Sequence, residues 1–416
     1  MTELERSDAL RAFKEGEAPL SCESLENLGT GIHVLSDFWE KMYLEDFIAR
    51  GGSKLKFVTG RRGAGVSFFL NTMKERARKD GFVTVSFSAR DIWLHDFREI
   101  YREIYRQCDL ENCLMGCARE VISRMGFDPE EIGEGMRFMD YLSSIGQNNA
   151  LTKRGIRDEL KEVFLDNPMM DNNFALCCSL ITGGILGYPV LEKQSEDILL
   201  AYLSGDKSVK LSMLRALGLS PSRITKYNAR HMLRSLCEAV RIGGYKGIYV
   251  SIDDLDILLS RTGSEHVRYT KMRRDDTYES IRQMIDEIDS LKNIMIVFGF
   301  DRILMDQDSW GFKSYQALWM RIQNEITGER FNKFNDIVNL DRLGKEIYTE
   351  EALVTMSERA ASYGNELAGE DLWHAIDRDR ARALIERSAL GGIGLPLMTL
   401  QALLEGDQTE TGLEVQ

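Results

Sequence analysis

The chain has 416 residues, 43% of them hydrophobic and 29% charged, a composition typical of globular proteins with a sizeable core. Its 66 acidic and 53 basic side chains give a formal net charge of −13, which disfavours broad, non-specific binding to phosphate backbones. The acidic, polar start (MTELERSDAL) is unlike a signal peptide, and no apolar run has the ~18 residues of a membrane span. We therefore expect a cytoplasmic protein without membrane contact, whose seven cysteines are free thiols.

Five short apolar runs bounded by glycine or charge predict the strands. They lie at residues 56–59, 83–87, 248–252, 294–298 and 337–340. Amphipathic helical patterns separate them, so the sequence predicts an α/β fold with a mostly parallel, five-stranded sheet.

The spacing of the strands also predicts the domain organisation. The gap between the second and third strands has helical periodicity, and a structureless loop of this length is implausible, so we expect a helical insertion there. The polar ends of the chain are expected to be mobile. The predicted parts are a flexible N-terminus (1–25), the first part of the sheet domain (26–90), the insertion (91–244), the second part of the sheet domain (245–345), a C-terminal helical lid (346–404) and a flexible tail (405–416).

A glycine-rich segment, GRRGAGVS, joins the first predicted strand to an apolar helix. The P-loop pattern is glycine, four residues, glycine, lysine and then serine or threonine. Gly60, Gly65 and Ser67 match it, whereas Val66 takes the lysine position. Backbone N–H groups of such a loop bind phosphate, and the serine hydroxyl is a predicted Mg²⁺ ligand. The candidate nucleotide-binding residues are Gly60, Arg61, Arg62, Gly63, Ala64, Gly65, Val66, Ser67 and Phe68.

The missing lysine matters because its charge contacts the β and γ phosphates. A hydrogen bond to a charged group contributes roughly 1.5–3 kcal/mol, so its loss predicts about ten- to a hundred-fold weaker binding. The decrease in the rate of phosphoryl transfer is expected to be larger than the decrease in affinity, since charge stabilisation dominates that reaction. Two alternatives remain: Arg61 or Arg62 reaches the phosphate instead, or the glycine-rich turn only joins strand and helix.

A second motif is the apolar strand GIYVSIDD, which ends in two carboxylates. P-loop enzymes need an aspartate at such a strand end to hold Mg²⁺ and a neighbouring acid to orient the attacking water. Asp253 is thus the candidate metal and catalytic residue, and Asp254 the candidate base, one methylene shorter than glutamate. Alternatively, the two aspartates cap the following helix.

Long stretches of the chain resemble the ATP-binding proteins of BREX-type bacterial phage-defence systems, relatives of the AAA+ and ORC/Cdc6-like ATPases. They include GGSKLKFVTGRRGAGVSFFL, GFVTVSFSARD, ITKYNARHMLRSLCEAVRIGGYKGIYVSIDDLDILL and IMIVFGFDRILMD. The resemblance implies an AAA+-like fold with ATP or ADP and Mg²⁺ as cofactors. It also implies a homo-oligomer, or a hetero-oligomer with other defence proteins such as a helicase or nuclease.

In such assemblies an arginine of one subunit reaches the nucleotide of the next. Arg321, in YQALWMRI, is the candidate for this catalytic role and Arg330 the alternative; the other interpretation is a surface arginine on an amphipathic helix. The lid of family members carries a Pro-Arg pair, where this chain has Pro396-Leu397. Val66 and Leu397 each remove a positive charge from the phosphate side.

The segment VRYTKMRR carries basic residues around an aromatic one, a pattern that can follow a nucleic-acid backbone. The candidate nucleic-acid contacts are Arg268, Lys271, Arg273 and Arg274. A solvated loop or an inter-subunit surface is the alternative interpretation.

These observations favour a hydrolysis-impaired AAA+-like subunit that acts as a regulator, scaffold or helicase loader in antiphage defence. The first alternative is an active ATPase in which Arg61, Arg62 or a partner residue replaces the lysine. The second is a DNA-binding adaptor that keeps the fold without using the nucleotide.

Overall fold

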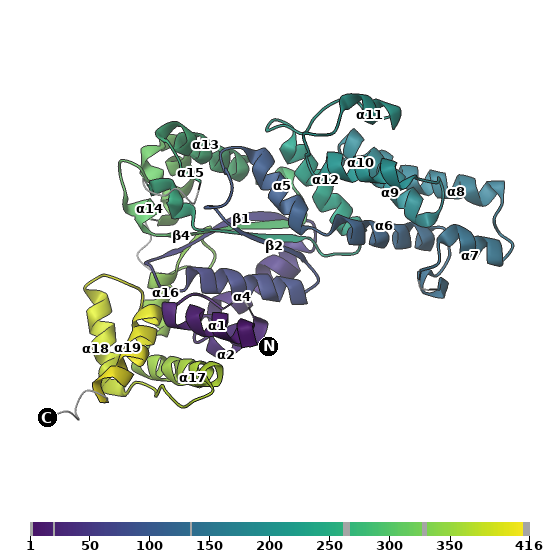
Figure 1. Ribbon diagram of the computed structural model, residues 1–416. Helices are drawn as coiled ribbons and strands as arrows, with labels where there is room; N and C mark the ends of the chain where they lie inside the picture. The colour runs from purple at the N-terminus through teal and green to yellow at the C-terminus, as the bar shows by residue number, and fades with distance from the viewer. Residues whose placement is uncertain (1–2, 20, 134, 261–266, 327–330, 411–416) are drawn as a thin grey trace.

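The computed structural model describes residues 3–19, 21–133, 135–260, 267–326 and 331–410. A five-stranded sheet lies at its centre, with helices on both faces and two helical regions at opposite ends (Figure 1). No helix within these ranges is long and apolar enough to cross a membrane.

The sheet confirms the predicted α/β class and the five strands. Its order is β2-β3-β4-β1-β5, and every neighbouring pair is parallel. The strands are β1 (Ser53–Gly60), β2 (Val83–Ser88), β3 (Ile248–Asp253), β4 (Ile294–Asp301) and β5 (Ile337–Asn339). Because all strands run the same way, their carboxyl ends form one edge, where Gly60 pairs with Asp301 and Ser88 with Asp253. Ligands of open parallel sheets bind at this edge.

The two faces of the sheet bury separate apolar cores. On one face, Val58 and Tyr249 pack with Trp39 and Phe69. The helical elements of this side are α3 (His33–Trp39), η1 (Glu40–Ile48) and α4 (Val66–Lys79). On the other face, Phe57 of β1 joins a larger core with α5 (Phe97–Gln107), α12 (Ala229–Ile242), α13 (Lys271–Glu287) and α15 (Gln316–Ile326). These strands are therefore apolar on both faces, which explains their nearly continuous hydrophobic runs.

The long connection from β2 to β3 is helical and projects away from the sheet (Figure 1). It contains α5 (Phe97–Gln107), α6 (Leu110–Arg124), α7 (Phe138–Ser144), α8 (Ala150–Leu160), α9 (Asn172–Leu186), α10 (Lys193–Leu203), α11 (Leu211–Ala216) and α12 (Ala229–Ile242), with short turns at Pro129–Glu131 and Lys161–Leu165. Five of the cysteines lie buried in these helices, where small thiols pack as apolar groups.

The connections from β3 to β5 contain η4 (Leu255–Leu259), α13 (Lys271–Glu287), η5 (Ile288–Ser290), α14 (Ile303–Asp306), η6 (Phe312–Ser314) and α15 (Gln316–Ile326). Four C-terminal helices follow β5, and the second of them packs against α1 (Glu3–Glu15) and α2 (Cys22–Leu28) (Figure 1). They are α16 (Leu340–Ile347), α17 (Glu350–Ala368), α18 (Arg378–Ala389) and α19 (Leu395–Glu410). We call α17 to α19 the lid.

Both ends of the chain form helices within the described residues. Residues Glu3–Glu15 form α1 and Cys22–Leu28 form α2. Phe13 is buried and meets Trp373 of the lid edge-to-face, with ring centroids 5.7 Å apart. Apolar residues at helical spacing give α1 an apolar face, and the lid covers this face. The polar composition of the segment as a whole did not indicate this contact. At the other end α19 continues to Glu410, and residues 411–416 of the predicted tail lie outside the described ranges.

Candidate nucleotide site at the carboxyl edge of the sheet

The glycine-rich loop has the backbone shape that phosphate binding requires. Gly63 and Gly65 have φ values of 78° and 93°, in the left-handed region that glycine adopts without strain. The N–H groups of Gly65, Val66 and Ser67 have no acceptor among the described residues, because they open helix α4. Unpaired N–H groups at a helix start favour a bound anion.

The loop and the acid pair meet at this edge. The Ser67 hydroxyl donates a hydrogen bond to Oδ2 of Asp253, and the two oxygens lie 2.5 Å apart. Burial raises the pKa of Asp253, and the hydrogen bond from Ser67 partly offsets this shift. A hydroxyl and a carboxylate in contact beside a phosphate loop fit a Mg²⁺ ion, which takes one or two protein ligands together with phosphate oxygens. A divalent cation would also hold Asp253 ionised.

Asp254 has a different environment from its neighbour. Its φ of 58° is unusual for a non-glycine residue, and its carboxylate is held by β2. Oδ2 accepts a hydrogen bond from the Ser88 hydroxyl at 2.7 Å, and Oδ1 pairs with the Arg90 guanidinium at 3.1 Å. Asp254 occupies the N-cap position of the next turn, η4 (Leu255–Leu259), but its side chain makes no capping hydrogen bond there.

Sequence reasoning missed Ser88 and Arg90. Both directly follow the second predicted strand, and the parallel sheet places that strand end beside β3. It also missed Asp301, which ends β4 and donates its N–H to Oδ1 of Asp256 at 3.0 Å. All three residues lie at or just after the carboxyl ends of predicted strands, and this position was the signal available in the sequence.

Arg61, a candidate replacement for the lysine, is engaged elsewhere. Its Nε donates to Oδ1 of Asp341 at 2.9 Å, and its terminal nitrogens donate to the carbonyl and hydroxyl of Ser388 at 2.9 and 3.0 Å. The guanidinium therefore links the loop to α16 and α18 rather than facing a phosphate. Arg62 is exposed, and its side chain makes no ion pair or hydrogen bond with the described part of the chain.

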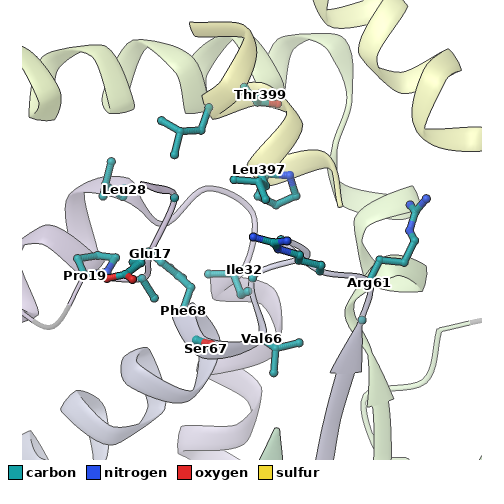
Figure 2. Close-up of a pocket in the computed structure, with 18 of the residues that line it drawn as sticks. Glu17, Pro19, Leu28, Ile32, Arg61, Val66, Ser67, Phe68, Leu397 and Thr399 are labelled. Atoms are coloured by element: carbon teal, nitrogen blue, oxygen red, sulfur yellow. The ribbon is translucent and has the colours of Figure 1, made fainter. Parts of the chain in front are cut away.

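The lid lies directly on the phosphate loop (Figure 2). The Gly394 N–H donates to the Arg62 carbonyl at 2.8 Å, and the Leu397 N–H donates to the Gly63 carbonyl at 3.2 Å. The contact is so close that a Cβ at Gly63 would lie 2.3 Å from the Cβ of Leu397. An apolar side chain, Leu397, thus contacts the loop at the position where the sequence comparison led us to expect an arginine.

Replacing Gly394 by alanine is expected to displace the start of α19 from the loop. A Cβ at position 394 would lie 2.5 Å from the backbone of Ala64, so the lid must shift to accommodate it. We expect faster amide hydrogen exchange over residues 394–400. Gly133→Ala is the matched control, because a Cβ there meets nothing within 4 Å. Unchanged exchange in Gly394→Ala would contradict the described contact.

Loop, strand ends and lid enclose a cavity of about 1130 Å³. This volume slightly exceeds the roughly 300–1,000 Å³ of ordinary ligand pockets, so it is large enough for a nucleotide. The N-terminal segment Glu15–Pro19 also lines it, and Figure 2 shows Glu17 and Pro19 from this segment. Among the described residues, six carboxylates and three arginines line the cavity, and two of the arginines are already paired. A triphosphate here therefore needs a divalent cation to offset the charge.

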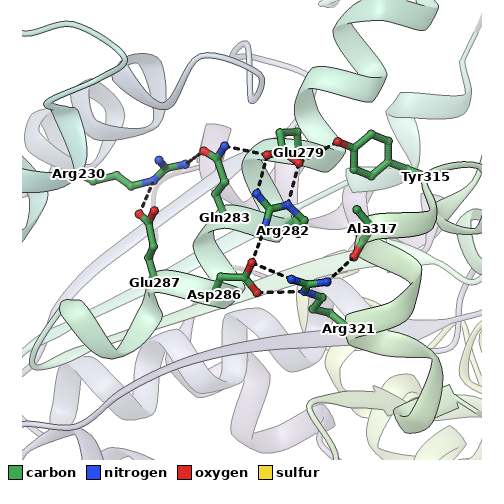
Figure 3. A network of polar contacts seen from close by, with 9 residues as sticks. All are labelled: Arg230, Glu279, Arg282, Gln283, Asp286, Glu287, Tyr315, Ala317 and Arg321. Atoms are coloured by element: carbon green, nitrogen blue, oxygen red, sulfur yellow. Dashed lines mark hydrogen bonds and ion pairs between the residues drawn. The ribbon is translucent and has the colours of Figure 1, made fainter.

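The structure does not bring Arg321 to the cavity. Its guanidinium pairs with Asp286 of α13, with Nε 3.1 Å from Oδ1, in a polar network between α13 and α15 (Figure 3). Arg282 and Glu279 extend this network toward Tyr315. Within one chain Arg321 links helices, and reaching the nucleotide of another subunit stays a prediction. The alternative, Arg330, lies outside the described residues.

The predicted nucleic-acid contacts separate into two groups. Arg268, Lys271 and Arg273 are exposed. Arg274 is only 3% exposed, and its guanidinium stacks over Trp310 at 4.4 Å. Tyr269 is also buried, with its hydroxyl between backbone groups of residues 92 and 94. The helical phase of α13, which the loop-like composition did not indicate, points Arg274 inward. We therefore withdraw Arg274 from the candidate nucleic-acid contacts.

A parallel sheet with a glycine-rich loop after β1 and an acidic end on β3 has the arrangement of P-loop nucleotide-binding proteins. The comparison with known families agrees: residues 2–388 match the model of the BREX system ATP-binding protein BrxC/D family, and the chain belongs to this family. Membership implies a P-loop fold and a role in a phage-defence system. No curated protein and no solved structure matches the chain.

Proposed function

We propose that this chain is a nucleotide-responsive, AAA+-like subunit of a BREX system that binds Mg²⁺–nucleotide but hydrolyses it poorly. One observation carries the proposal: Ser67 and Asp253 are in contact beside a loop with unpaired N–H groups, whereas Val66 occupies the lysine position. The position of β4 between β1 and β3, followed by a helical lid, supports the AAA+-like interpretation.

In this proposal the loop N–H groups bind the phosphates, and Ser67 and Asp253 hold the cation. Bound Mg²⁺ would supply positive charge to the phosphate oxygens. Asp254 is a poor water-orienting base, because Ser88 and Arg90 already bind both of its oxygens. With neither lysine nor a free base, the site favours binding over phosphoryl transfer.

The contacts between the lid and the loop would allow a bound nucleotide to change the position of the lid. Its α18 and α19 contact the loop through Ser388, Gly394 and Leu397. Occupancy of the loop would change these contacts, and partners that contact the lid would sense the change. This mechanism suits a regulator, scaffold or helicase loader within a homo-oligomer or an assembly with other defence proteins.

The alternative of an active ATPase now depends on Arg62 or on a partner residue, since Arg61 is bound by Asp341 and Ser388. Arg62 lines the cavity and is exposed, so it is the residue in the loop that is able to turn toward a phosphate. Phosphate release that disappears in Arg62→Ala would favour this alternative.

The proposed function is tested by the Mg²⁺ dependence of nucleotide binding. We expect ATP to bind the wild-type chain at least tenfold more tightly with Mg²⁺ than with EDTA, since the cavity is rich in carboxylates. Asp253→Asn should remove most of this difference, as measured by isothermal titration calorimetry. Asp301→Asn, another cavity carboxylate outside the Ser67 contact, is the control. Equal Mg²⁺ dependence in wild type and Asp253→Asn would contradict the assignment.

A further inference from the structure

A second region of unusual charge lies outside the nucleotide cavity, between α10 and α12. Residues 206–228 contain a single acid, Asp206. Their cations are all exposed and form no ion pair within the described residues: Lys207, Lys210, Arg215, Arg223 and Lys226. In a chain of net charge −13, such an unpaired basic segment is a local exception.

The start of α13 presents a second set of unpaired cations. Arg268, Lys271 and Arg273 are exposed, and none of them forms an ion pair with a described residue. No acid occurs in residues 267–274. By contrast, Arg282 and Arg321 further along the same region are paired with carboxylates.

The second of these segments packs against Trp93, whose ring contacts His95. The Arg273 guanidinium stacks over the Trp93 ring at 4.0 Å, and the rings of Trp93 and His95 are 5.3 Å apart. Burial lowers the pKa of His95, and the positive charges of Arg273 and Lys226 lower it further. Asp96 and Asp276 act in the opposite direction. Asp96 itself pairs with Arg98.

The helices that adjoin the two segments are in contact. Arg230 at the start of α12 donates to Gln283 of α13 at 2.8 Å (Figure 3). Beyond it, Lys226 lies 5.2 Å from the ring of Tyr227, which is 82% exposed. The ring of Tyr227 is thus open to solvent beside a cation.

We propose that Arg223, Lys226, Tyr227, Arg268, Lys271 and Arg273 form a basic surface that binds single-stranded nucleic acid. The cations contact successive backbone phosphates, and Tyr227 stacks on an unpaired base. Bases have free faces in single strands, so Tyr227 favours a single strand over a duplex or an acidic protein. None of the six residues lines the nucleotide cavity, so the inference is independent of nucleotide binding.

The test measures the fluorescence anisotropy of a labelled dT 20-mer with the full chain, at 50 to 200 mM NaCl and without nucleotide. The test variant carries Arg223→Gln, Lys226→Gln and Arg273→Gln. The matched control carries Lys41→Gln, Lys292→Gln and Lys345→Gln, three exposed lysines away from the basic surface that form no ion pair within the described residues. Thermal unfolding of both variants verifies that they are folded.

We expect the test variant to bind at least tenfold more weakly than wild type, while the control stays within about twofold. The slope of log affinity against log salt should fall by about 2, since each phosphate contact in a single strand contributes about 0.7. Tyr227→Ala should weaken binding of the dT 20-mer about tenfold, with little effect on a duplex of the same length.

Three results would overturn the proposal. The first is no binding by wild type, and the second is equal binding by the test variant and the control. The third is competition by a 20-residue polyglutamate as strong as that by unlabelled dT 20-mer, which would assign the surface to an acidic protein. A duplex bound more tightly than the single strand, with Tyr227→Ala neutral for both, would remove the stacking role and the preference for a single strand.

Discussion

Replacing Val66 by lysine is expected to tighten binding of Mg²⁺–ATP by about ten- to a hundred-fold, the effect of one hydrogen bond to a charged group. The loop backbone, Ser67 and Asp253 already have a suitable arrangement, so the substitution adds the one absent group. Isothermal titration calorimetry measures the change directly.

The matched control is Val66→Met, which has a long side chain without charge. Val66 lies near Gly299 and Asp253, where a Cβ at position 299 would be 3.0 Å from Val66 and 2.6 Å from the carboxylate. Crowding there affects both variants, whereas charge is present in only one. If Val66→Lys and Val66→Met bind with the same affinity, the missing charge is not what limits phosphate binding.

The second large effect is expected from Arg61→Ala, which removes the link between loop and lid. Asp341 is 6% exposed and would lose its ion-pair partner. Breaking a pair of this burial destabilises a protein by about 3 kcal/mol, because one charge stays buried. We expect a clearly lower urea midpoint and faster hydrogen exchange in residues 388–400.

Arg62→Ala is the control for this prediction, since it removes the same side chain one residue further along. The Arg62 side chain is exposed and makes no ion pair or hydrogen bond with the described residues, so the free energy of unfolding of Arg62→Ala should change by less than about 0.5 kcal/mol. Equal destabilisation by the two variants would show that Arg61 does not hold the lid.

The strands and the glycine-rich loop depend mainly on local sequence patterns, and these patterns predicted them. Apolar runs predicted all five strands, and the glycine spacing placed the loop between β1 and α4. The contact between Ser67 and Asp253, 186 residues apart, was also within reach, because the carboxyl ends of parallel strands share one edge.

Other features depend on partners that are distant in the sequence. The engagement of Arg61 by Asp341 and Ser388 needs the position of the lid, which no motif states. The burial of Arg274 depends on the helical phase of α13 against Trp310. The docking of Phe13 on Trp373 joins the two ends of the chain. The sequence gives the charge or polarity of each residue, but it does not show which distant residues that side chain contacts in the fold.

The central claim, binding of nucleotide with little hydrolysis, is tested most directly by phosphate release from Mg²⁺–ATP at a saturation established by calorimetry. We predict that wild type binds the nucleotide yet releases phosphate no faster than Asp253→Asn. Release by wild type well above background, and its loss in Asp253→Asn, would instead establish an active ATPase that works without the lysine.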